Sequence, residues 1–167
     1  VDAGLHVAAA IIGSRRVFDW VDGRDDVIMV ASNYSHGPLA LARQHRFTAV
    51  NSAIEVALDG AINAEVVGHR VMSGPGGQPD FALGASLAPD GIAIVALPAT
   101  AGSARTSRIV PEIGPGAPVT VSRHLADRVV TEFGVAELRG IDLGERARRL
   151  VAVADPAHRE ALSAATG

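Results

Sequence analysis

Apolar residues at the start of this chain alternate between short continuous runs and segments with helical spacing. Residues 6–13 (HVAAAIIG) and 27–31 (VIMVA) are continuous apolar runs, which predict buried strands. Residues 15–21 and 38–44 have the spacing of short helices, the second with a proline in its first turn. Apolar strands that alternate with helices predict a parallel sheet covered on both faces.

The middle of the chain predicts antiparallel pairing instead. Residues 47–58 form a strand-like run, the Asp-Gly pair at 59–60 is a hairpin signal, and residues 61–67 continue as the partner strand. A turn at 68–69 then leads to a further short strand over 70–72. We therefore expect a local antiparallel meander within an α/β fold.

The second half returns to strands and helices around one long loop. Residues 91–97 (GIAIVAL) are the clearest apolar run and predict a buried strand. Gly, Pro, Ser and Thr predominate from 98 to 118, and a loop of that length is usually functional. In the helix predicted over 142–152, Asp142 is the N-cap and Glu145 completes a capping box. The remaining predictions are a helix over 81–87, short strands over 119–122 and 128–131, and a closing helix over 156–165.

Composition excludes several kinds of chemistry. The chain has 167 residues, 48% of them apolar, which is enough to build one core without disulfides or metals. All 15 basic residues are Arg, and the lack of Lys and Cys excludes Schiff-base lysines, thiolate nucleophiles and Cys-ligated zinc. A net charge of −3 gives no general attraction for nucleic acid or an anionic membrane.

The organisation predicted is one domain over residues 1–167, because no repeat or linker divides the chain. No apolar run is long enough to span a bilayer, so we expect a cytoplasmic protein. The first residue is Val rather than Met and the apolar pattern begins at once. We therefore expect a fragment of a larger polypeptide.

A glycine cluster before the helix predicted over 81–87 is the first candidate site. Gly74, Gly76 and Gly77 would let backbone N–H groups approach a ligand, and the helix N-terminus adds partial positive charge. An oxyanion, a phosphate or a thioester carbonyl suits such a place. The cluster is neither a GxGxxG motif nor a P-loop, and a tight turn that only connects two elements is the alternative.

Isolated polar residues are the other candidates. Asn51 and Glu55 lie four positions apart in one predicted strand, so both face the same side and need a ligand or a neighbouring loop as partner. Arg105, Arg108 and Arg123 can bind a phosphate or a carboxylate, or only solvate the surface. The six histidines lack metal-binding spacing and no serine lies in a G-x-S-x-G elbow, so no metal site and no serine nucleophile is predicted.

Four segments in order carry a resemblance to a known family. They are VNSAIEVALDGAINAEVVGHRVMSGPGGQPDF, ALPATAGSARTSRIVP, GAPVTVSRHLADRVVTEFGVAELRG and GERARRLVAVADPAHREAL. Together they resemble the C-terminal domain of the acetyl-CoA hydrolase/transferase family, which includes acetate and 4-hydroxybutyrate CoA-transferases. The resemblance covers nearly the whole chain.

The resemblance implies a CoA-transferase-like α/β fold: an open, mostly parallel sheet with flanking helices and a local antiparallel hairpin. It implies acyl-CoA, with its coenzyme A, and a small carboxylate as substrates, and no metal. The active site would lie between this domain and an N-terminal domain of the same protein, and a homodimer is also open. In such enzymes a glutamate attacks the acyl-CoA and a glutamyl-CoA thioester follows, which is covalent catalysis by a carboxylate.

The resemblance also implies roles for the glycine cluster and its neighbours. The backbone N–H groups of Gly76 and Gly77 would lie near the thioester oxygen. Asn51, Gly74 and Gln78 would line the site that holds coenzyme A.

Two departures from the family pattern concern the nucleophile and the CoA phosphate. The nucleophilic glutamate is expected upstream of this chain, and Glu132, although in a T-E pair, matches a different family motif. Gly102 stands where relatives carry a lysine for the CoA phosphate, and Arg105 is expected to substitute for that lysine.

We therefore expect the CoA-binding, oxyanion-supplying half of an acyl-CoA:carboxylate CoA-transferase or an acyl-CoA hydrolase, which folds but is inactive by itself. The alternative is a binding module of the same fold that holds CoA or another nucleotide without chemistry. A third hypothesis is a purely structural domain that completes a dimer. The sequence encoded upstream of Val1 separates the first hypothesis from the binding module, because only the first requires a glutamate there. Titration calorimetry that shows no CoA binding would favour the structural domain.

Overall fold

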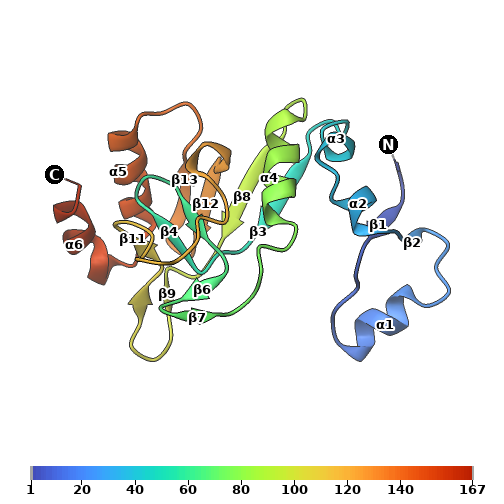
Figure 1. Ribbon diagram of the computed structural model, residues 1–167, viewed down its shortest axis with the longest axis horizontal. Coiled ribbons are helices and arrows are strands. Elements are labelled where there is room, and N and C mark those ends of the chain that lie inside the picture. Colours follow the sequence, from blue (N-terminus) through green and yellow to red (C-terminus); the bar gives the residue numbers. More distant parts are fainter. Residues whose placement is uncertain (1, 167) are drawn as a thin grey trace.

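A four-stranded sheet is the central element of the computed structural model, which describes residues 2–166 (Figure 1). Its spatial order is β13 (Gly134–Glu137), β12 (Arg128–Thr131), β8 (Ile92–Ala96) and β3 (Thr48–Asn51). Strands β12, β8 and β3 are parallel, and β13 pairs antiparallel with β12. This confirms the predicted open, mostly parallel sheet, and β13 is a strand that the sequence pattern did not predict.

Two helices close one face of this sheet. Helix α4 (Gln78–Leu87) packs on β3 and β8, and α5 (Leu143–Val153) packs on β12 and β13. On the opposite face, Val50 and Val135 are 64% and 54% exposed. Helices therefore do not cover both faces as predicted. Helix α4 also begins three residues before the predicted range, because a proline stands in its first turn, where no backbone N–H is needed.

A second sheet faces the first across the core. It has three strands in the order β11 (Ile109–Val110), β4 (Glu55–Ala57) and β5 (Ile62–Asn63), with β11 and β4 parallel. The β4–β5 hairpin and the hairpin of β6 (Val66–Val67) with β7 (Arg70–Val71) confirm the predicted antiparallel pairing. A continuous meander does not form, because the strand predicted over 61–67 divides into β5 and β6, which belong to separate sheets.

Asp59 and Gly60 each have a distinct role in the turn between β4 and β5. Gly60 has a φ of +93°, which favours glycine, and the Asp59 carboxylate accepts the Ala61 N–H at 2.8 Å. The single strand predicted over 47–58 is wrong, since the chain leaves the four-stranded sheet after Asn51 and enters the three-stranded sheet at Glu55.

The predicted loop over 98–118 contains more structure than its composition indicates. It holds the hairpin of β9 (Thr100–Ala101) with β10 (Thr106–Ser107), followed by β11. The strand predicted over 119–122 is wrong, because only an isolated bridge from Val121 to Ile62 forms there. The Thr120 hydroxyl instead bonds the Ala64 N–H and the Glu65 carboxylate, at 2.9 and 2.8 Å.

The C-terminal elements agree with the sequence pattern. The Asp142 carboxylate caps α5 by accepting the Glu145 N–H at 2.8 Å. The return bond of a capping box is missing, because the Glu145 carboxylate binds Arg148 and Arg149 instead. The closing helix consists of a 3-10 turn, η2 (Pro156–His158), and α6 (Arg159–Ala164), and a second 3-10 turn, η1 (Arg123–Leu125), precedes β12.

The N-terminal segment lies beside this body in Figure 1. Strands β1 (His6–Ala8) and β2 (Val27–Met29) form a parallel pair joined through α1 (Arg15–Val21). The predicted burial of both strands is wrong, because neither strand nor α1 contains a buried residue, and Ile12 is 91% exposed. A two-stranded parallel sheet with one helix has too few layers to bury both of its faces.

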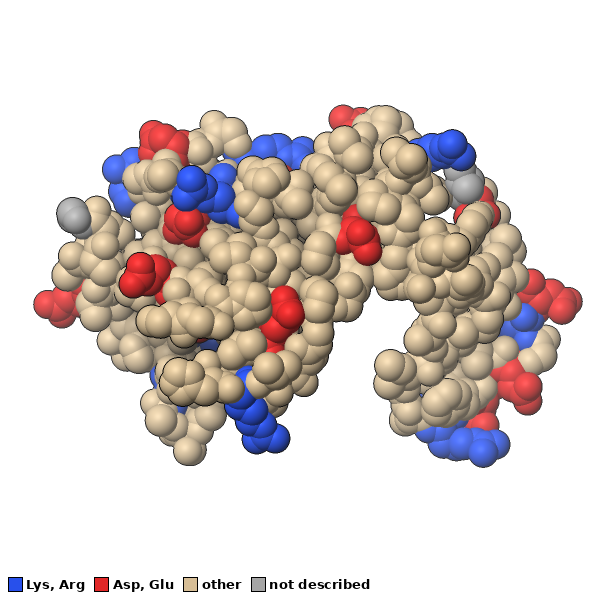
Figure 2. All heavy atoms as spheres, in the orientation of Figure 1, with Lys and Arg blue, Asp and Glu red and all other residues tan. Residues whose placement is uncertain are grey.

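Two short helices, α2 (Ser32–Ser35) and α3 (Pro38–Leu41), connect this segment to β3. Helix α3 packs on α4, and Leu41 is the buried apolar residue at that contact. Figure 2 shows a deep hollow between the N-terminal segment and the body. On the face shown there, acidic and basic side chains are interspersed rather than gathered by sign.

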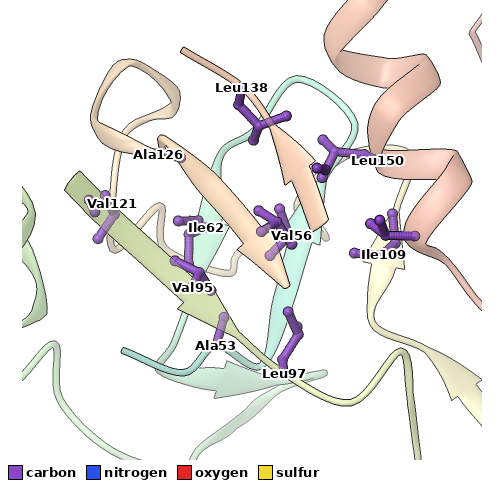
Figure 3. Packing of buried hydrophobic residues seen from close by; sticks show 14 of the residues in the cluster. Ala53, Val56, Ile62, Val95, Leu97, Ile109, Val121, Ala126, Leu138 and Leu150 are labelled. Carbon is purple, nitrogen blue, oxygen red and sulfur yellow. The ribbon is translucent and has the colours of Figure 1, made fainter. Parts of the chain in front are cut away.

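The hydrophobic core lies between the two sheets, α4 and α5 (Figure 3). Val56 and Ile62 from the three-stranded sheet meet Val95 and Val129 from the four-stranded sheet, and Leu150 of α5 closes the end. Every member of this cluster lies within residues 49–162. No helix of residues 2–166 is both long enough and apolar enough to cross a membrane.

Candidate functional site

The glycine loop enters α4 with its backbone donors unpaired. Gly76 has a φ of +57°, a conformation that favours glycine, and Gly77 is the N-cap of α4 without a side-chain cap. Within residues 2–166, the N–H groups of Gly74, Gly76 and Gly77 have no hydrogen-bond acceptor. These N–H groups can therefore donate to an anionic or carbonyl oxygen of a ligand.

The loop lies at the carboxyl edge of the parallel strands. Asn51 ends β3, and the chain after α4 runs directly into the beginning of β8, which places the first turn of α4 toward the ends of β3 and β8. Ligands of open α/β sheets bind at this edge. Gln78, in the first turn of α4, is only 7% exposed and its amide nitrogen has no hydrogen-bond partner among the described residues.

An open cleft of about 610 Å³ lies against the loop. Gly76 and Gly77 line one side of it, and the segment around α2 lines the other. The complete lining is Ser32, Asn33, His36, Gly37, Pro38, Gly76, Gly77 and Asp80. A larger open cleft of about 960 Å³ lies between the N-terminal segment and the body, and its lining shares Ser32 and His36 with the smaller one.

His36 is the cleft residue that the sequence did not indicate. Its imidazole lies against Gly77, its Nδ1 is 2.8 Å from the Ser35 hydroxyl, and its ring meets Phe81 edge-on at 4.9 Å. His36 belongs to no sequence motif that is typical of a metal site or of a nucleophile and its base. The sequence alone therefore gives no reason to select it. The contact with Gly77 depends on residues far apart in the chain.

The other predicted ligand-binding residues line neither of these two clefts. Asn51 is half-buried and its amide makes no hydrogen bond within residues 2–166. Gln78 follows the lining residue Gly77 directly, and Gly74 lies two positions before the lining residue Gly76. Arg105 is in the turn between β9 and β10, with its guanidinium bound to the Asp155 carboxylate. The Ala157 N–H and then Arg105 lower the pKa of Asp155.

The remaining polar candidates have structural partners. Asn51 and Glu55 do not share a strand, and the Glu55 carboxylate accepts the Asn63 amide at 3.0 Å. Arg108 donates to the Ala53 carbonyl at 3.2 Å, and Arg123 donates to a carboxylate at 3.0 Å.

Glu132 and the histidine and carboxylate side chains are the remaining reactive groups. The Glu132 carboxylate accepts the Ala99 N–H at 2.8 Å. Among the described residues, no three His, Asp or Glu side chains are grouped so as to hold a metal ion.

A mostly parallel sheet with a glycine loop opening a helix at its carboxyl edge places the chain among CoA-transferase folds. The crystal structure of 4-hydroxybutyrate CoA-transferase from Porphyromonas gingivalis matches it with a TM-score of 0.81 and 33% identity, over 98% of this chain and 37% of that one. The chain belongs to the acetyl-CoA hydrolase/transferase family, since residues 13–166 match the family's C-terminal domain.

Curated relatives agree with this family and extend beyond the chain. The 4-hydroxybutyrate coenzyme A transferase of Clostridium kluyveri is 40% identical over 95% of this chain and 37% of its own length. The acetyl-CoA hydrolase of Yarrowia lipolytica is 31% identical over 91% of this chain and 29% of its own length. The chain thus spans about a third of the length of these two relatives.

Proposed function

We propose that residues 1–167 act as one C-terminal domain of an acyl-CoA:carboxylate CoA-transferase or an acyl-CoA hydrolase. The observation that carries this proposal is the pair Gly76 and Gly77, which line a cleft at the first turn of α4 and whose N–H groups have no acceptor among the described residues. Family membership supports a thioester as the group that these donors meet.

The chemistry proposed for this chain is stabilisation of a developing oxyanion. A carboxylate nucleophile that attacks a thioester carbonyl places negative charge on the carbonyl oxygen, and fixed N–H donors lower the energy of that state. In our proposal the nucleophilic glutamate comes from the part of the complete protein outside this chain. Gln78 and Asn51 contribute amide groups toward coenzyme A at the same edge of the sheet.

The partner proposed is the N-terminal domain of the same polypeptide. The exposed apolar side chains of the N-terminal segment, such as Phe18 and Ile12, need a cover that residues 2–166 do not supply. A homodimer in which a second copy adds to this cover is compatible with the same surface. A contact of Arg105 with the CoA phosphate remains part of the proposal, and it requires the guanidinium to be shared with Asp155.

The substrates proposed are an acyl-CoA and a small carboxylate of acetate-type metabolism in the cytoplasm. The 4-hydroxybutyrate transferase named above supports a carboxylate as the acceptor, and the acetyl-CoA hydrolase supports water. Coenzyme A is a substrate in this scheme, and no metal takes part in it.

The test uses the complete polypeptide that contains this chain. Acetyl-CoA is incubated with butyrate, propionate, succinate or 4-hydroxybutyrate, and CoA esters and free CoA are measured by mass spectrometry. A transferase forms the new ester, and a hydrolase releases free CoA. Binding of CoA in calorimetry without either product would overturn the proposal in favour of a non-catalytic CoA-binding module, and absence of binding would favour a structural domain.

Gly76→Ala probes the loop in the same assay. Its positive φ strains any side chain, so the N–H donors shift and kcat is expected to fall about 100-fold, the effect of losing one oxyanion donor. Gly114→Ala is the matched control, because a Cβ there meets nothing within 4 Å and its backbone has no positive φ. Equal activity of both variants would remove the loop from the mechanism.

A further inference from the structure

The space beside the Gly77 Cα is occupied by His36. A Cβ built on Gly77 would lie 2.1 Å from His36 Cδ2 and 2.6 Å from Nε2, far inside contact distance. The backbone of Gly77 has a φ of −88° and a ψ of 1°, which L-residues also adopt. A side chain at Gly77 is therefore excluded by the imidazole and not by the backbone conformation. At Gly76 the reverse holds, because the space around it is open but its φ is +57°.

Two residues besides Gly77 hold the imidazole in place. Ser35 Oγ lies 2.8 Å from Nδ1, and the Phe81 ring meets the imidazole edge-on with centroids 4.9 Å apart. Phe81 in turn stacks on Phe47, which packs against the core. The imidazole therefore connects the glycine loop, through aromatic contacts, to the hydrophobic core.

The backbone near His36 is fixed by the contact of α3 with α4. Leu41 is 8% exposed, and a Cβ on Gly84 of α4 would lie 2.5 Å from the Leu41 Cβ. Helix α3 thus approaches α4 closely, only a few residues after His36. The distance between the imidazole and the first turn of α4 is consequently set by packing on α4 itself.

We propose that His36 is a positioning residue, which holds the backbone of Gly76 and Gly77 so that the N–H groups of these two residues point into the cleft. The inference rests on the proposed function of that loop. The imidazole acts through the loop backbone and forms no bond with the substrate. Its removal would let the peptide rotate, and the donors would lose the fixed orientation that oxyanion stabilisation requires.

The experiment is a double-mutant cycle in the complete polypeptide, with kcat and KM for acyl-CoA as readouts. Gly77→Ala is expected to lower kcat about 100-fold because its methyl group displaces the imidazole and the loop. His36→Ala is expected to lower kcat about tenfold with little change in KM. The double variant gains the space that the methyl group needs, so its kcat is expected near that of His36→Ala rather than at the product of both losses.

Gly76→Ala with and without His36→Ala is the matched control. The strain in Gly76→Ala comes from its backbone conformation and not from a clash with the imidazole. The kcat losses of Gly76→Ala and His36→Ala should therefore multiply, and His36→Ala should not rescue Gly76→Ala. His69→Ala, in the exposed turn between β6 and β7, should leave kcat unchanged. His36→Gln keeps a planar polar group against Gly77 and should recover part of the activity, while melting temperatures of all His36 variants stay near that of the wild type.

Three results would overturn the inference: unchanged kcat in His36→Ala, no rescue in the Gly77 double variant, or a kcat loss that merely follows a loss of folding. An inactive wild-type polypeptide would instead contradict the proposed function. The two failures are thus distinguishable in one series of measurements.

Discussion

Residues 2–46 and residues 47–166 contain similar kinds of apolar segments but bury them very differently. In the second region, Val56, Ile62 and Leu150 are fully buried in one cluster. In the first region, Leu41 is the only described apolar residue that is buried, and Phe18 in α1 is 47% exposed. Apolar spacing thus indicates which residues need a cover, whereas the layers available decide whether they obtain one.

The cleft lies where these two regions meet. Its lining combines a loop held by α4, which packs on the core, with the segment around α2, in which no residue is buried. A site built across such a boundary responds to changes in either region. The difference in burial can therefore be measured as a difference in stability, and three comparisons test it.

The largest contrast is expected between Leu150→Ala and Phe18→Ala. Leu150 is fully buried in α5, and its truncation should lower the free energy of unfolding by about 2–5 kcal/mol. Phe18→Ala should cost less than about 1 kcal/mol in residues 1–167, because the ring is already half exposed. Urea denaturation of both variants measures the two values.

The same pair sharpens the comparison in the complete polypeptide. If another domain covers α1, Phe18→Ala should become clearly more costly there, whereas the cost of Leu150→Ala should stay similar. Equal costs of the two substitutions in residues 1–167 alone would contradict the view that the N-terminal segment lacks a core of its own.

A smaller contrast concerns the first residues of two helices. Asp142 caps α5 with its carboxylate, so Asp142→Ala should cost about 1 kcal/mol. Ser14 precedes α1 without a side-chain cap bond, so Ser14→Ala should be close to neutral. Thermal unfolding followed by circular dichroism compares them, and an equal loss in both variants would contradict the assignment of the caps.

The smallest effect is expected in acid. The Ala157 N–H and Arg105 lower the pKa of Asp155 below its value in the unfolded chain, so this carboxylate stabilises the fold above about pH 4. That contribution is lost as the pH falls below about 4 toward the folded-state pKa, because the unfolded state then binds the proton more readily. Melting temperatures of Asp155→Asn should therefore decrease less than those of the wild type between about pH 5 and pH 3.

Asp26→Asn is the corresponding control in the N-terminal region. Arg24 lowers the pKa of Asp26, but this pair lies on a segment without a core. Its substitution should change the acid dependence of global unfolding less than Asp155→Asn does. A steeper acid dependence in Asp155→Asn than in the wild type would have the wrong sign for this account.

Sequence patterns predicted the elements whose determinants are local. The apolar run of β8, the strand β12 and the Asp142 cap each depend on neighbouring residues, and the structure confirms all three. Two-residue strands such as β9 and β10 are too short to show a period, and the break between Asn51 and Glu55 depends on which sheet each end joins. Tertiary pairing decides such elements.

The candidate site divides in the same way. Gly76 and Gly77 could be found because glycines before a helix have a local meaning. His36 could not be found from the sequence, because the role proposed for it depends on a contact with Gly77, about forty positions further along the chain. The pairing of Arg105 with Asp155 also joins residues far apart in the chain. The sequence predicted an arginine available for the CoA phosphate, whereas the structure shows its guanidinium bound to a carboxylate.

The order of the strands along the chain also determines when the core between the two sheets can form during synthesis. Strand β4 pairs in parallel with β11, and β8 needs β12, which follows it by more than thirty positions. Such distant pairings carry a loop-closure entropy before any contact compensates it, which slows folding. Until β12 and α5 have left the ribosome, the opposing sheet consists of β3 and β8 alone, so Val56 and Ile62 lack part of their cover in the nascent chain.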